Sequence, residues 1–180
     1  MLFAPDTEEV LEFATALVNT AAGASDELST VEDLAALLGG YPFSGRIDHD
    51  TAELAAVREA RDRLRSVWTL ERDDAVMAVN RILRDAGALP YLTRHDGSDW
   101  HIHATEPSAP LAERILVEAA LALIDVIRMD ETDRLRVCAA HDCAGIFIDL
   151  SRNGSKRFCS VRCGNRMNMI AYRRRSGKDH

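Results

Sequence analysis

The first 137 residues of this 180-residue chain contain no cysteine, and no part of the chain has a hydrophobic run long enough to span a membrane. The most apolar stretch, residues 114–129, is interrupted by Glu118 and Asp125 and therefore predicts a buried helix. The first ten residues, MLFAPDTEEV, lack the positive region and the apolar segment of a secretion signal. We therefore expect a cytoplasmic protein that has no membrane partner.

Sequence patterns that would indicate an enzyme are also missing. The chain has no glycine-rich phosphate loop, no nucleophile elbow and no pair of acidic residues with the pattern of a catalytic pocket. It has no internal repeats either. We therefore predict that the protein is not an enzyme.

Charge is distributed unevenly along the chain, whose formal net charge is −7. Residues 135–180 contain ten Lys or Arg and three Asp, which gives a formal charge of +7. The remaining residues contain 12 Lys or Arg and 26 Asp or Glu, which gives −14. We refer to residues 135–180 as the tail and to the residues before them as the body. Because a polyanion repels an acidic body and attracts a basic tail, this pattern indicates that a nucleic acid would contact the tail alone.

Hydrophobic residues at helical spacing occupy most of the chain before the tail, and the hydrophobic content of 47% is sufficient for a core. The spacing predicts helices at about residues 6–22, 29–38, 49–70, 73–86 and 106–129. Asp6 or Thr7 is expected to cap the first helix, and the last is apolar on most sides and is expected at the centre. An Asp96-Gly97 turn between two short alternating runs predicts a hairpin. We therefore expect residues 1–132 to form a helical domain with one hairpin.

All four cysteines lie in the tail, as two pairs with the spacing C-x4-C, fifteen residues, C-x3-C. Paired cysteines in an intracellular protein favour a metal ion over disulfides, and four thiolates form the closed tetrahedral shell of structural zinc. The tail also has few large apolar residues, so a metal ion would supply the stability that its core lacks. His141 is an alternative to Cys143, although the symmetry of the two pairs favours the cysteine. We predict one structural Zn²⁺ ion per chain, with the ligands Cys138, Cys143, Cys159 and Cys163.

The order of local patterns in residues 133–180 predicts a treble-clef-like zinc finger. A knuckle at residues 136–144 is followed by a strand at 146–151, a turn at 152–155 and a return strand at 156–159. Ser160 is then expected to cap a helix that extends to Arg175. The whole chain is therefore predicted to be mainly α with a small β-hairpin (α+β), with a helical N-terminal domain followed by this finger.

The last predicted helix has two distinct faces at 100° per residue. Cys163, Met167 and Ile170 share the face expected to point at the metal, and Arg162, Arg166 and Arg173 share a neighbouring basic face. A solvated charged face is the alternative interpretation, but the single sign of the charge and the excess of arginine over lysine favour nucleic acid. The predicted nucleic-acid contacts are Arg152, Lys156, Arg157, Arg162, Asn165, Arg166, Arg173 and Arg174.

The segment FIDLSRNGSKRFCSVRCGNR resembles the CGNR zinc finger, which is named for the residues that stand here as Cys163, Gly164, Asn165 and Arg166. The helix order and hairpin of the preceding region are similar to the ABATE domain that commonly precedes this finger. The resemblance implies a bacterial, stress-linked transcriptional regulator in which the finger binds DNA and the body senses a ligand.

Three residues of the finger qualify this resemblance. Phe158 stands where family members usually have tryptophan, and Asn168 stands where a lysine is common, which removes one phosphate contact. Asn165 has two interpretations that remain open: it braces the knuckle, or it contacts a base.

Two histidines in the predicted hairpin, His101 and His103, are expected on one side of a strand because they alternate with Ile102. A ligand site or second metal site is one interpretation. The solvated face of a hairpin is the other, and it is favoured because the sequence places no third donor nearby.

The expected partners of the protein are DNA, an unknown small-molecule effector and a second copy of the chain. A homodimer would supply the affinity that a single small finger lacks. Binding to DNA would make the cytoplasmic protein nucleoid-associated. An RNA-binding module and a protein-interaction module are the alternative functions.

Overall fold

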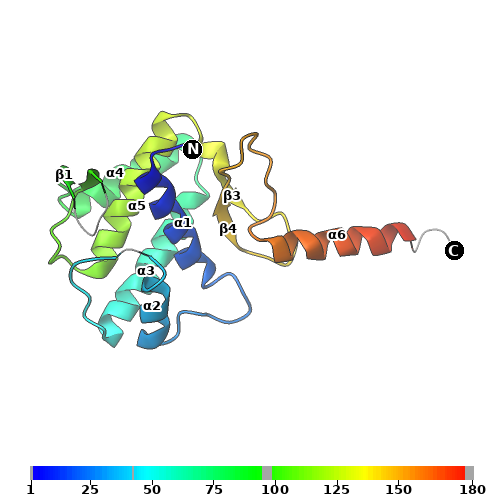
Figure 1. Cartoon of the computed structure of the whole chain (residues 1–180), viewed down its shortest axis with the longest axis horizontal. Helices are drawn as coiled ribbons and strands as arrows, with labels where there is room; N and C mark the ends of the chain where they lie inside the picture. The colour runs from blue at the N-terminus through cyan, green and yellow to red at the C-terminus, as the bar shows by residue number, and fades with distance from the viewer. Residues whose placement is uncertain (1, 42, 95–98, 177–180) are drawn as a thin grey trace.

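The computed structural model describes residues 2–41, 43–94 and 99–176. Within these residues, the body consists of the helices α1 (Pro5–Asn19), α2 (Val31–Leu38), α3 (Thr51–Trp68), α4 (Arg72–Asp85) and α5 (Leu111–Arg128), and of the strands β1 (Tyr91–Thr93) and β2 (His101–His103). A short 3-10 turn, η1 (Thr132–Arg134), leads into the tail, which comprises the strands β3 (Leu135–Val137) and β4 (Ile146–Ile148) and the helix α6 (Val161–Ser176). Figure 1 shows the body helices packed together and α6 extending away from them. The predicted fold class, mainly helical with small antiparallel strand pairs, is confirmed.

Helix α5 lies at the centre of the body, as predicted, and packs against α1, α3 and α4. Most of its side chains are buried, which explains why its sequence is apolar on nearly every side. The two acids that interrupt this sequence each have a partner. Asp125 Oδ2 accepts a hydrogen bond from Thr7 Oγ1 (2.9 Å), and Glu118 Oε1 lies 2.5 Å from His103 Nδ1. In the part of the chain that the structure describes, no helix is both long and apolar enough to cross a membrane.

The helix starts follow local capping chemistry, with one correction. Helix α1 begins at Pro5 with Ala4 as its N-cap, so the predicted cap at Asp6 or Thr7 is wrong. Proline is well suited to the first helical position, where its missing N–H would have no partner in any case. At the start of α2, Thr30 Oγ1 accepts a hydrogen bond from Asp33 N (3.1 Å), and the Asp33 carboxylate accepts one from Thr30 N (2.8 Å).

The connection between α1 and α2 is held against α3 by ion pairs. Asp26 accepts hydrogen bonds from Arg61 at 2.7 and 3.0 Å and from Arg58 at 2.8 Å. The Arg61 side chain is 7% exposed and that of Asp26 is 24% exposed, so this pair is largely shielded from water. The adjacent Arg61 guanidinium holds the pKa of the Asp26 carboxyl well below its usual range.

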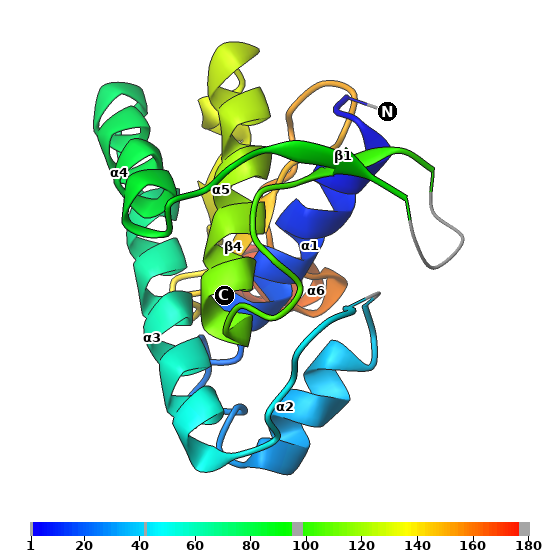
Figure 2. The same ribbon diagram turned by 90° about the vertical axis from the view of Figure 1, so that its left-hand side faces the viewer.

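The predicted hairpin of the body is confirmed by the antiparallel pairing of β1 and β2, with Tyr91 opposite His103 and Thr93 opposite His101. Its predicted Asp96-Gly97 turn lies outside the described residues. The hairpin and α6 are on opposite sides of the body in Figure 1, and Figure 2 shows the hairpin from its own side, with α6 behind. The body therefore separates these two parts of the chain.

The second strand pair differs from the prediction. Strand β4 lies within the predicted strand at 146–151, but its antiparallel partner is β3, with Leu135 opposite Ile148. The predicted return strand at 156–159 is wrong, because no strand is assigned to these residues. The physical reason is that the buried carboxylate of Asp149 accepts a hydrogen bond from Lys156 N, so a side chain satisfies a donor that a strand ladder would have used.

Strand β4 also joins the finger to the body. Ile146 and Ile148 belong to the same hydrophobic core as α1, α3 and α5, and all three residues of β4 are buried. Helix α1 packs directly against this strand. The finger therefore shares the core of the body instead of depending on its own few apolar residues.

Candidate metal centre and nucleic-acid interface

The four cysteines predicted to bind zinc meet in one cluster. Their Sγ atoms all lie within 4.8 Å of one another, and both the Cys143–Cys159 and the Cys159–Cys163 sulfur pairs are 3.7 Å apart. These separations are too long for disulfide bonds of about 2.05 Å. They match the sulfur separation of about 3.8 Å that follows from four sulfurs placed about 2.3 Å from a tetrahedral zinc ion. The donor set thus fits a metal ion, and Cys143, not His141, belongs to it.

Backbone N–H groups are directed at the thiol cluster. Cys159 N donates to Cys138 Sγ and Gly145 N donates to Cys143 Sγ, each at 3.4 Å. Such hydrogen bonds stabilise the thiolate charge and orient the ligands. Gly145 has little space around it, because a Cβ there would lie 3.1 Å from Cys159 Sγ and 3.2 Å from Asn19 Oδ1. The absence of a side chain at Gly145 thus lets the backbone pass between the metal centre and the body.

The body contacts this region through Asn19, the last residue of α1. Its Nδ2 donates to the Ile146 carbonyl (2.9 Å), and its Oδ1 accepts from Ile146 N (2.7 Å). The amide thus supplies β4 with the donor and acceptor that a neighbouring strand would supply. No sequence pattern assigns a role to Asn19, because a polar residue at a helix end is common and its partner lies 127 residues away.

The surroundings of the thiols shift their acidity in different directions. Burial raises the pKa of Cys143 and of Cys159, because a buried thiolate is poorly solvated. The Ser160 hydroxyl lowers the pKa of Cys163, which also lies in the first turn of α6, where the helix dipole favours negative charge. Metal binding to these thiols therefore releases protons and weakens as the pH falls.

A buried carboxylate orders the loop that leads to the second cysteine pair. Asp149 Oδ1 accepts hydrogen bonds from Ser151 N (3.0 Å) and Oγ (2.5 Å), and Oδ2 accepts one from Lys156 N (2.8 Å). Burial opposes ionisation of Asp149, but these hydrogen bonds outweigh it and lower the pKa of the carboxyl. Arg136 Nη1 lies 3.6 Å from Oδ2, and Arg134 Nη1 donates to the carbonyls of Asp149 and Ser151. Both arginines are thus occupied in bracing the loop.

Helix α6 begins as predicted, with Ser160 Oγ accepting a hydrogen bond from Cys163 N (3.2 Å). Cys163 is buried, and Met167 packs with it against Cys138 and Ala140. Cys163 and Met167 therefore point at the metal centre, as the sequence predicts, whereas Ile170, the third residue predicted on this face, is not part of this cluster. Residues 171–176 are all exposed, and this end of the helix projects into solvent in Figure 1.

Seven of the eight predicted nucleic-acid contacts are exposed, namely Arg152, Lys156, Arg157, Arg162, Asn165, Arg173 and Arg174. None of the charged residues in this set forms an ion pair with another described residue. Lys156 and Arg157 lie over the rings of Phe147 and Phe158, at 5.2 and 5.7 Å from the ring centres. The side chain of Asn165 forms no hydrogen bond with another described residue, so the structure gives this side chain no bracing contact.

Arg166, the eighth predicted contact, has a different environment. Its Nη2 donates to Asp142 Oδ1 (2.7 Å) and lies 3.6 Å from Cys163 Sγ, and its Nε is buried. Asp142 belongs to the first knuckle, so this contact links the two halves of the cysteine site. Helical spacing predicts that Arg166 lies on an outward basic face, whereas the structure directs its guanidinium at the metal centre. Its positive charge there would offset the net negative charge of four thiolates around a divalent ion.

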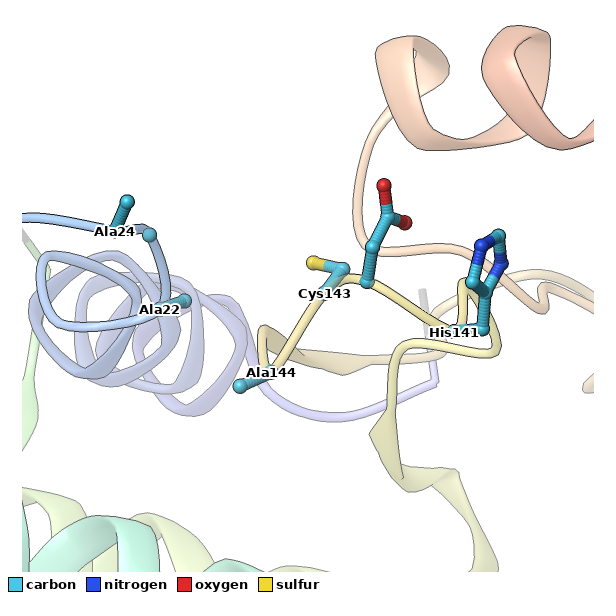
Figure 3. A pocket seen from close by; sticks show the side chains of 7 residues that line it. Ala22, Ala24, His141, Cys143 and Ala144 are labelled. Atoms are coloured by element: carbon cyan, nitrogen blue, oxygen red, sulfur yellow. The ribbon is translucent and has the colours of Figure 1, made fainter.

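An open hollow lies beside the first knuckle. It is lined by residues 22–24, which follow α1, and by residues 141–144 of the knuckle. Figure 3 shows Ala22 and Ala24 on one side of it, with Cys143 and His141 on the other. The hollow thus brings solvent to one edge of the metal centre.

His101 and His103 lie outside this site. They belong to the hairpin, on the side of the body opposite to α6 (Figures 1 and 2). Their rings lie edge to face, with ring centres 4.8 Å apart and an angle of 75° between the ring planes. The structure therefore keeps the two histidines separate from the four cysteines.

These features define a protein with a helical body, a four-cysteine zinc finger and a basic C-terminal helix. The CGNR zinc finger family model matches residues 134–176, and the ABATE family model, described as "Putative stress-induced transcription regulator", matches residues 11–130. The chain belongs to the ABATE family and carries a CGNR zinc finger, as its sequence patterns predict. A comparison with proteins of curated function finds no match.

Proposed function

We propose that this protein is a transcriptional regulator whose zinc finger binds duplex DNA. The observation that carries the proposal is the exposed end of α6, where Arg173 and Arg174 project from the body without an ion-pair partner among the described residues. Arg162 near the helix start and Arg152 in the preceding loop are also exposed cations. Arginines that are not neutralised by the protein attract phosphates strongly and bind them with two parallel hydrogen bonds.

In this proposal, one Zn²⁺ ion per chain has a structural role. Four cysteine ligands complete its coordination and leave no position for a reactive water. The ion fixes the start of α6 relative to the first knuckle, and Arg166 supports this arrangement through Asp142 and Cys163. We therefore assign Arg166 to the metal centre and the remaining exposed cations to DNA, and we assign no catalytic activity to the site.

Duplex DNA is favoured over single-stranded RNA by the shortage of exposed aromatic rings in the finger. Phe147 is 4% exposed and Phe158 is half-buried, whereas Tyr172 is 60% exposed. Proteins that bind single strands place several aromatic rings against successive bases. One exposed tyrosine offers a single stacking position, so the finger is better suited to phosphate contacts along a duplex.

Residues 1–132 are the proposed sensing part and residues 133–180 the proposed DNA-binding part. The body carries the acidic charge, which keeps it away from DNA, and it contacts the finger through Asn19 and β4. A small-molecule effector that shifts α1 would therefore also shift the finger, because the two are in direct contact. We further propose a homodimer, because one small finger buries little DNA surface and a second copy raises the effective concentration.

The test is a salt titration of the full-length, zinc-loaded protein on a mixed-sequence DNA duplex. Each phosphate contact contributes about 0.9 to the slope of log affinity against log salt, so we expect a steep slope for the wild type. Replacement of both Arg173 and Arg174 by alanine is expected to reduce this slope by about 2. The matched control replaces Arg81 and Arg84, two exposed arginines of α4 in the body, and should leave the slope unchanged.

Two outcomes would contradict the proposal. A wild-type slope near zero would exclude binding through exposed arginines, and equal slopes for the two double variants would exclude α6 as the contact. Competition with duplex RNA and with single-stranded RNA in the same titration distinguishes DNA from RNA. Preferential binding of either RNA would replace the DNA assignment.

A further inference from the structure

One side of helix α6 is open to solvent along its whole length. In a helical projection at 100° per residue, Asn165, Met169 and Tyr172 fall within about 60° of one another, on the side opposite to Cys163. Asn165 is exposed, and Met169 and Tyr172 are 53% and 60% exposed. Val161, the first residue of the helix, shares this side and is 80% exposed. We refer to Val161, Asn165, Met169 and Tyr172 as the open face.

Arginines border the open face on both sides, and its centre carries no charge. In the same projection, Arg162 and Arg173 lie within about 80° of Asn165 on one side, and Arg175 lies about 80° from it on the other. All three arginines are exposed, and none forms an ion pair with another described residue. Helix α6 contains no acidic residue. This arrangement complements a DNA groove, in which phosphates form the two rims and uncharged base edges form the floor.

The open face has no contact that would explain it within the described finger. The side chain of Asn165 forms no hydrogen bond with another described residue, and neither Met169 nor Tyr172 belongs to a hydrophobic cluster of the described chain. Large apolar side chains gathered on one exposed surface are typical of a contact site. A second copy of the chain is a poor occupant, because pairing two such helices would bring their arginines together and like charges repel each other. The charge therefore favours a polyanion.

The dimensions of α6 fit the major groove of duplex DNA. With its side chains an α-helix is about 10 to 12 Å wide, which the major groove of about 12 Å admits and the minor groove of about 6 Å does not. Residues 171–176 are all exposed and project away from the body (Figure 1). Arg162 and Arg173 are separated by about 16 Å along the helix axis. They are therefore far enough apart to reach different phosphates while the open face lies against the bases.

Asn165 carries the chemistry that recognises an adenine. A side-chain amide offers a donor and an acceptor side by side, and these match the N7 acceptor and the N6 amino group of adenine in the major groove. Met169 lies one helical turn later, about 6 Å further along the axis, which is close to two base-pair steps of about 3.4 Å. An apolar side chain at that position suits the methyl group of thymine, which only A·T pairs present in this groove.

We infer that the open face of α6 recognises A·T base pairs in the major groove, with Asn165 as the contact to adenine and Met169 as the contact to the thymine methyl group. The inference rests on the proposed function, since it requires duplex DNA at this helix, and it adds sequence selectivity to the phosphate contacts. The arginines position the helix, whereas Asn165 and Met169 determine which sequence is bound.

The experiment begins with a duplex of randomised sequence, from which full-length, zinc-loaded protein selects a preferred site. Each adenine of that site is then exchanged for 7-deazaadenine, which lacks the N7 acceptor and keeps its base pairing. At one position this exchange should weaken wild-type binding about 5-fold, the effect of one hydrogen bond. Asn165→Ala should weaken binding to the selected duplex by about 5- to 150-fold and make it insensitive to the exchange. Because the amide is uncharged, the salt slope should not change.

Met169 and the arginines have their own measurements. Uracil in place of thymine removes the methyl group, and Met169→Ala should abolish the sensitivity of binding to this exchange. Arg173→Ala should lower the salt slope by about 1 and weaken binding to all sequences equally. The matched control, Asn80→Ala in α4 of the body, should retain the affinity and the sequence preference of the wild type. The zinc content of each variant shows whether its finger is intact.

The outcomes separate this inference from the proposed function. A steep salt slope with the same sequence preference for the wild type and Asn165→Ala would overturn the inference and leave the proposed function in place. Selection of no preferred site by the wild type would do the same, whereas a wild-type slope near zero would overturn both. If Asn165→Ala and Met169→Ala reduced the dimer fraction in gel filtration and weakened binding to every sequence alike, the open face would be a contact between copies and the inference would be wrong.

Discussion

The side-chain amide of Asn19 forms two hydrogen bonds with the backbone of Ile146, one as donor at 2.9 Å and one as acceptor at 2.7 Å. Ile146 is fully buried and directly follows Gly145, whose backbone N–H is bonded to Cys143 Sγ. The C-terminal end of α1 is thus linked to the metal ligand Cys143 through only two consecutive backbone residues, Ile146 and Gly145. Stability of the body and retention of zinc should therefore depend on each other.

Asn19→Ala tests this dependence. The change leaves the buried Ile146 N–H and carbonyl without partners, so we expect a loss of about 1 to 3 kcal/mol in the free energy of unfolding. Faster zinc release to a competing chelator should accompany the loss. Asn165→Ala removes an exposed amide from the finger and should change neither quantity. If Asn19→Ala released zinc at the wild-type rate, the proposed link between body and metal centre would be wrong.

Arg166 and Arg173 should separate zinc retention from DNA binding. Arg166→Gln removes the charge beside Cys163 and the ion pair with Asp142, and we expect about a 10-fold increase in zinc loss to a chelator. Arg173→Gln should leave zinc retention unchanged and lower the salt slope of DNA binding by about 1. The same two assays on both variants make each the control of the other. A reversed pattern would return Arg166 to the DNA contacts.

The pair formed by Asp26 and Arg61 predicts a pH dependence of stability. Because Arg61 holds the folded-state pKa of Asp26 below its ordinary value of about 3.9, the carboxylate contributes its full stability above that pH. Asp26→Asn is expected to cost about 3 kcal/mol at pH 7, since it leaves the shielded Arg61 with only the longer and more exposed contact to Asp62 (3.4 Å) as an ion pair among the described residues. Urea unfolding should show this difference constant between pH 7 and pH 5 and shrinking at lower pH. A difference that grew on acidification would contradict the sign of the pKa shift.

Asp149, a buried carboxylate inside the finger, provides a second test. Asp149→Asn replaces one acceptor oxygen with a donor, so Lys156 N or the Ser151 pair loses its partner, at an expected cost of about 1 to 3 kcal/mol. Zinc retention should fall as the loop before Cys159 loses its order. The control, Asp133→Asn, changes an exposed acid near the start of the tail and should have no measurable effect on stability. Equal stability of the two variants would show that the loop is held by other contacts.

Local chemistry explains which features were predictable from the sequence. The spacing of the cysteine pairs predicts a metal site. Thr30 and Ser160 indicate helix starts because each directly precedes a run of residues with helical periodicity. The pairing of β4 with β3 was not predictable, because three-residue strands carry no alternation and the hydrogen bonds from Lys156 and Ser151 to Asp149 replaced the expected return strand.

Long side chains limited the prediction of the site. Helical spacing correctly places the Cα of Arg166 between those of Arg162 and Arg173, but the guanidinium reaches an acid 24 positions earlier in the chain. The metal-facing role of Cys163 and Met167 was predictable because short or buried side chains follow the direction of their Cα–Cβ bonds. For Asn19 the decisive partner is a backbone group 127 positions away, and no sequence pattern marks such a group.

The attachment of α6 at one end has a mechanical consequence. The helix has 16 residues and is therefore about 24 Å long, and its packing against the finger is confined to its first turns. A change at the metal centre, where α6 is attached, would therefore be amplified along the length of the helix. A rotation of roughly 10° at that point would move the arginine-bearing tip by about 4 Å, comparable with the distance over which an ion pair with a phosphate is made or broken.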